Sequence, residues 1–168
     1  MPESQVQGVL KSIAMGRNRF LYGLDQVPDD RLNWNPGGEA PSPLKLAGKT
    51  AVFLRAFAHV LQHGTWPQGL SFSSGPPADR EAAKAALEEA FASLRQVIVN
   101  LSEADLAAPI TLEWGRAPDG VVLELQLREM VAATPSVIGY HQGQLNLLQL
   151  VWGDSSANIP PNWGKEQI

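Results

Sequence analysis

Apolar residues recur at steps of three and four along four long stretches of the chain, a spacing typical of amphipathic helices. The pattern predicts helices over residues 3–26, 42–63, 78 or 79 to 101, and 124–152. In the last of these, His141 falls on the same apolar face as Leu145 and Trp152. A buried imidazole needs a polar partner, so most of the functional information in the sequence depends on what His141 contacts.

Capping and breaking residues mark where the predicted helices begin and end. Ser42 is a good N-cap, and Pro43 suits the first position of the second helix. Gly64 is a natural terminator of that helix, and Asp79 is expected to cap the third. The connections are then expected over residues 31–43, 65–77 and 102–109, the last as a turn or a single helical turn.

The helical period breaks between the third and last helices. Two short strands, residues 110–114 and 121–123, are predicted around a turn at residues 115–120. Further on, Pro135 follows Thr134 inside the last helix, which predicts either a kink or a restart capped by Thr134. The expected fold is all-α, a four-helix bundle with a small β-hairpin insertion before the last helix. The order of the helices in the bundle stays open.

Length and composition agree with a single domain over residues 1–168, with residues 155–168 as an extended tail. Of the 168 residues 44% are hydrophobic and 18% charged, and the net charge is -4. No cluster of basic residues is present, so a nucleic-acid surface is not expected. Without cysteine there is no disulfide or thiolate site. No signal peptide and no membrane span are predicted, so a cytoplasmic location is expected.

Several motifs of the chain resemble those of one family of bacterial four-helix bundles. They are Leu32-Asn33-Trp34-Asn35-Pro36, Ser42-Pro43-Leu44, Leu112-Glu113-Trp114-Gly115 and, most specifically, Tyr140-His141-Gln142-Gly143-Gln144-Leu145. In this order the motifs resemble the DinB-like superfamily, which also includes thiol-dependent transferases. The resemblance extends from about residue 5 to residue 153 and implies the same bundle fold.

The resemblance also implies where a metal would be held. Many members bind nickel or zinc with three histidines, one from the second helix and two from the last helix, four residues apart. The corresponding positions here are Lys49, Val137 and His141. Valine has no donor atom and an ammonium group has no lone pair. We therefore expect no metal and no other cofactor, with His141 as the only retained ligand position.

Other residues offer alternative sites. His59 and His63 are four residues apart and form either a relocated metal pair or two histidines near a helix end. Lys49 either reaches solvent or Glu39, or shares a cavity with His141. Other candidates for the lining of that cavity are Val137, Tyr140, Gln144 and, as a roof or only a packing contact, Trp34.

Three functional hypotheses follow from these residues. The first is a bundle protein that has lost the metal site and binds a small anion or carboxylate at Lys49 and His141, or is non-catalytic. The second is a hydrolase or thiol transferase that uses zinc or nickel with a shifted ligand set around His141. The third is a purely structural partner with no ligand. The expected partners are a small molecule and a second copy in a homodimer formed through exposed apolar helix faces and the tail.

Overall fold

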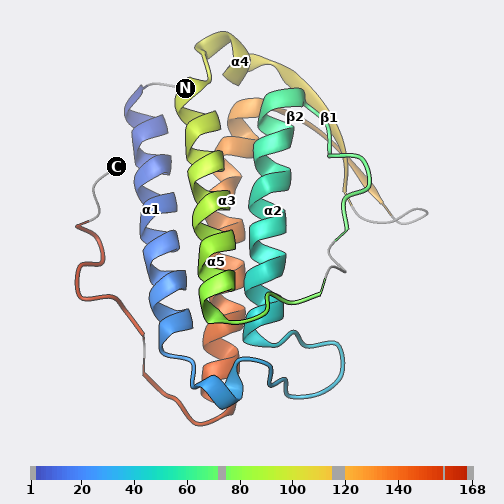
Figure 1. The fold of residues 1–168 in the computed structure, drawn as a ribbon. Coiled ribbons are helices and arrows are strands. Elements are labelled where there is room, and N and C mark those ends of the chain that lie inside the picture. Colours follow the sequence, from blue (N-terminus) through green and yellow to red (C-terminus); the bar gives the residue numbers. More distant parts are fainter. Residues whose placement is uncertain (1–2, 72–74, 115–119, 157, 166–168) are drawn as a thin grey trace.

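Four long helices form the body of the protein in the computed structural model, which describes residues 3–71, 75–114, 120–156 and 158–165 (Figure 1). The long helices are α1 (Glu3–Asp25), α2 (Pro43–His63), α3 (Arg80–Asn100) and α5 (Leu127–Val151). Shorter elements are η1 (Asp29–Arg31), α4 (Glu103–Ala107), β1 (Pro109–Trp114) and β2 (Val121–Gln126). The predicted bundle with a hairpin before the last helix is confirmed. No helix among the described residues is both long and apolar enough to cross a bilayer.

The helix ends follow local rules read from the sequence. The Ser42 hydroxyl accepts from the backbone N–H of Lys45 at 3.3 Å, with Pro43 at the first helical position. Gly64 ends α2 with a φ of 71°, a left-handed conformation that glycine adopts without steric cost. The Asp79 side chain accepts from Ala82 N at 2.8 Å at the start of α3. These predicted caps are confirmed.

The four helices enclose the core in the order α1, α3, α2, α5, each packing on the next and α5 closing on α1. After α2, the chain returns along that helix before α3 begins (Figure 1). On the way Trp66 packs edge-on against Phe57 at 6.0 Å, and Pro77 lies against Gly48. The long connection therefore makes α2 and α3 parallel, which settles the order that the sequence left open.

Close packing of α1 on α5 depends on glycine. A Cβ added at Gly16 would lie 2.7 Å from the Cγ2 atom of Ile138, which is almost completely buried. Seven residues further along α1, the carbonyl oxygen of Gly23 accepts from the buried Gln149 side chain at 3.3 Å. The two helices thus run side by side in the same direction and in close contact.

The hairpin extends further than its sequence pattern predicted. Strands β1 and β2 pair antiparallel from Pro109 opposite Gln126 to Trp114 opposite Val121. The predicted end of the second strand at residue 123 and the predicted start of the last helix at residue 124 were therefore wrong. The helix begins at Leu127, where Glu129 accepts from the Gln126 backbone N–H at 2.7 Å and completes a capping box. Within the predicted turn, residues 115–119 lie outside the described residues.

Pro135 does not interrupt α5. The helix continues from Leu127 to Val151, so a restart capped by Thr134 was wrong. Instead, the buried Thr134 hydroxyl donates to the carbonyl oxygen of Met130 at 3.1 Å, one turn earlier. The tail after Gly153 returns toward α1, where the Arg19 guanidinium lies 5.6 Å from the centre of the Trp163 ring. This contact places part of the tail against α1 of the same chain.

Candidate functional site

The candidate site lies where α2 and α5 pack in opposite directions. Each helix contributes residues four apart, which face the same side of that helix. We call the set the α2–α5 site: Lys49, Phe53 and Phe57 from α2, with Ala133, Val137 and His141 from α5. The ring centres of Phe53 and His141 are 5.2 Å apart, and Phe57 and Val137 line one cavity. The site therefore brings together the three positions that the family resemblance indicated.

His141 is a buried polar residue without a complete set of partners. Its side chain is only 4% exposed. The Nδ1 atom is buried and has no hydrogen-bond partner in the part of the chain that the structure describes. The Phe53 ring lies against the imidazole, and the ring of the adjacent Tyr140 is 5.3 Å away. A buried nitrogen without a partner is costly, so a group that hydrogen-bonds to this ring would be stabilising.

The electrostatic surroundings keep His141 neutral. Burial lowers its pKa from 6.5 to about 4, and the positive charge of Lys49 lowers the pKa in the same direction. At pH 7 the ring is therefore an uncharged imidazole, with one nitrogen able to donate and the other able to accept. In this state it can hydrogen-bond to a ligand or position a proton without repelling the nearby ammonium group.

Lys49 lies close enough to His141 for its charge to affect that ring. The side chain is half-buried, and within the described residues it makes no salt bridge. Glu39, a carboxylate that could have neutralised it, is exposed and does not pair with it. Lys49 therefore supplies a positive charge at the end of the α2–α5 site, beside a neutral imidazole.

The structure places three other residues singled out from the sequence outside the candidate site: Tyr140, Gln144 and Trp34. Tyr140 is 64% exposed, and its hydroxyl accepts from the Gln144 side chain at 3.0 Å on the outside of α5. Trp34 packs edge-on against Trp152 at 5.8 Å, below the end of α5. Since Trp152 is eleven residues from His141, about 16 Å along a helix, the structure does not bring Trp34 to the candidate site.

An apolar cavity adjoins Val137, and sequence reasoning missed it. It has a volume of about 520 Å³, and its walls come from α2, α5 and the hairpin. The lining residues are Phe57, Leu112, Val121, Leu123, Leu125, Glu129, Met130, Ala133 and Val137. Leu123 and Leu125 alternate with outward-facing residues in β2, which is the only sequence signal that this face of the hairpin covers something.

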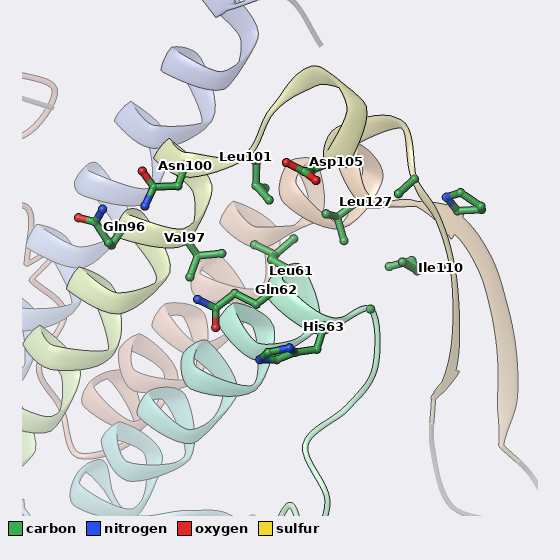
Figure 2. Close-up of a pocket in the computed structure, with 13 residues that line it drawn as sticks. Leu61, Gln62, His63, Gln96, Val97, Asn100, Leu101, Asp105, Ile110 and Leu127 are labelled. Atoms are coloured by element: carbon green, nitrogen blue, oxygen red, sulfur yellow. The ribbon is translucent and has the colours of Figure 1, made fainter.

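No group of three or more histidine, cysteine, aspartate or glutamate side chains comes together in the described ranges in a way that could hold a metal ion. His59 and His63 have ring centres 4.4 Å apart, but no third ligand joins them within those ranges. His63 also lines a hollow of about 600 Å³ between the ends of α2 and α3, where Gln62 and Asn100 lie on opposite sides (Figure 2).

Comparison with known proteins identifies relatives of the fold. The model of the DinB superfamily matches residues 13–144. Among solved structures, the crystal structure of the DinB-like protein YjoA from Bacillus subtilis is similar, with a TM-score of 0.66 and 13% sequence identity. The match covers 91% of this chain and 96% of that one. No curated protein matches.

Proposed function

This chain belongs to the DinB superfamily, and from that premise we propose that it binds a small carboxylate at the α2–α5 site, in place of the three-histidine metal centre of many relatives. Lys49 neutralises the carboxylate, and the imidazole of His141 donates a hydrogen bond to it. No metal takes part in this proposal. The protein acts as a binding protein, and no chemical step is assigned to it.

The observation that supports this proposal is the pairing of two groups: an ammonium group that forms no salt bridge with any described residue, and a buried, neutral imidazole. The charge of Lys49 lowers the pKa of His141 and so favours the neutral ring. An anion placed between the two residues would be attracted by the ammonium group and could accept a hydrogen bond from the imidazole. Such an anion would also provide a partner for a nitrogen that otherwise has none. A divalent cation at the same place would be repelled by the ammonium group.

Titration with acetate and benzoate, followed by calorimetry and by the shift in melting temperature, tests the proposal. We expect binding that Lys49→Met reduces at least tenfold, because an apolar side chain of similar length removes only the charge. Lys45→Met is the matched control, since Lys45 is exposed on the same helix one turn earlier. Absence of binding would contradict the proposal and favour a purely structural protein. Binding that is equally strong in Lys49→Met would contradict the role of Lys49 and place the carboxylate elsewhere.

Metal analysis tests the competing enzyme hypothesis. In protein purified without a histidine tag, about one equivalent of zinc or nickel that His141→Ala removes would favour a metal-dependent hydrolase or thiol transferase with a shifted ligand set around His141. We expect less than a tenth of an equivalent. The reason is that Val137 offers no donor atom and Lys49 adds a positive charge beside the one remaining ligand.

We also propose that the chain forms a homodimer through the outer face of α5. From residue 130 to residue 151 the sequence contains no charged residue, although this helix is partly exposed. The exposed large residues on it are Tyr140, Leu147, Leu150 and Val151, each more than half exposed. A face of this kind matches a second copy of itself, since neither copy buries a charge. The mass in solution, measured by light scattering, tests this assembly.

A further inference from the structure

We propose that the ligand of the α2–α5 site is a monocarboxylate with an apolar chain, whose head lies between Lys49 and His141 and whose chain occupies the cavity beneath the hairpin. This inference rests on the proposed carboxylate site and adds the chemical class of the ligand. It follows from the arrangement along α2 and α5, where Lys49 and His141 form a polar end and the apolar cavity beneath the hairpin lies next to it.

The cavity is suited to an alkyl or aryl group. All but one of its lining residues are apolar, and they come from α2, α5 and both strands of the hairpin. Its volume of about 520 Å³ falls within the range of small-molecule sites, roughly 300–1,000 Å³. Apolar surface that remains open to water favours a ligand that covers it, because burial of that surface is favourable.

The polar and apolar parts adjoin each other. Val137, in the cavity wall, lies one helical turn from His141 on the same face of α5, about 6 Å along the axis. Phe57, also in the wall, lies one turn from Phe53, whose ring contacts His141. On both α2 and α5, the residue that lines the cavity is therefore one turn nearer the hairpin than the residue at the polar end. A ligand bound at His141 reaches the cavity by extending over that one turn.

The charges at the two ends fix the direction of the ligand. Glu129 is the only charged residue that lines the cavity among those described. Its carboxylate is held at the start of α5, where it accepts from the Gln126 backbone N–H at 2.7 Å. This negative charge repels an anionic head at the hairpin end, whereas Lys49 attracts one at the other end. The carboxylate of the ligand therefore points away from the hairpin.

Calorimetric titration with acetate, butanoate, hexanoate and octanoate measures the effect of the chain. Each added CH₂ is expected to increase affinity about threefold to fourfold until the cavity is filled. Ala133→Phe should remove most of this dependence on chain length, because the new ring occupies the part of the cavity next to α5. Ala132→Phe is the matched control, since Ala132 is exposed on the same helix but does not line the cavity. Circular dichroism melting of both variants confirms that they fold.

Each outcome distinguishes this inference from the proposed function. If acetate and octanoate bind equally well, the proposed carboxylate site stands and the apolar chain is refuted. If neither acid binds to the protein, both proposals fail together. If octanoate binding survives Lys49→Met but not Ala133→Phe, the cavity binds the chain without the head, and the inference is overturned. Octanol of the same chain length should bind at least tenfold more weakly than octanoate.

Discussion

Protonation of His141 should destabilise the folded protein, and the structure gives the size of the effect. Burial, assisted by Lys49, lowers the pKa of His141 from 6.5 to about 4. Between these values the unfolded chain binds a proton that the folded protein does not, so stability falls as the pH falls from about 6.5 to about 4. The difference of about 2.5 in pKa corresponds to about 3 kcal/mol. At pH 4.5 most of this, about 2–3 kcal/mol, should already be lost.

Urea unfolding at pH 7.5 and pH 4.5 measures the loss. Carboxylates such as Asp105 and Asp154, whose pKa values are lowered by hydrogen bonds from Ser102 and Ser156, also affect stability in acid. His141→Leu corrects for them, because it removes the imidazole and keeps an apolar side chain in its place. The loss between the two pH values should be about 2–3 kcal/mol larger in the natural protein than in this variant.

Two results would refute the reasoning. The first is an equal loss of stability in the natural protein and in His141→Leu. The second is an imidazole resonance, assigned to His141 by its absence from His141→Leu spectra, that titrates near pH 6.5. Lys49→Met provides a further check on the physical cause. Since the Lys49 charge is the second contribution to the lowered pKa, its removal should raise the pKa part of the way toward 6.5 and reduce the loss at pH 4.5.

Three further substitutions test packing, capping and assembly. Gly16→Ala should lower the free energy of unfolding in urea by about 1–3 kcal/mol, because the new Cβ would collide with Ile138. The control Gly8→Ala lies on the same helix with open space around it, and it should raise the free energy of unfolding by about 0.5–1 kcal/mol. Equal effects would contradict the close packing of α1 on α5. Ser42→Ala should cost about 1 kcal/mol through loss of the N-cap, and no cost would contradict that cap. Leu147→Glu should convert a dimer to a monomer in light scattering, and an unchanged mass would contradict an interface on the outer face of α5.

The extent of the hairpin shows where sequence reasoning lost accuracy. Residues 124–126 can be read as the start of a helix, since Glu124 and Leu125 continue the helical pattern that follows. The structure instead pairs Glu124 with Thr111, Leu125 with Ile110, and Gln126 with Pro109. Cross-strand pairing is a contact between distant parts of the chain, and it outweighed local helical preference. The cavity beneath the hairpin escaped prediction for the same reason, because its walls come from three separate segments.

Residues near one another in the sequence determined the limits of α2 and the start of α3. The caps at Ser42 and Asp79 and the terminator at Gly64 act through hydrogen bonds and backbone angles within a single turn, so they can be read without knowledge of the fold. The apolar spacing likewise determined which face of each helix is buried. The family motifs, rather than the spacing, indicated that Lys49, Val137 and His141 belong together; their role in binding stays a prediction.

Only the tertiary structure decided the surroundings of those residues. It made α2 and α3 parallel and set α5 against α2 in the opposite direction, which places the ammonium group of Lys49 beside the imidazole of His141. It also turned the Tyr140 hydroxyl outward and placed Trp34 on Trp152. A sequence pattern specifies the face of a helix on which a residue lies, but the burial and charge that set a pKa come from whichever other helix packs against that face.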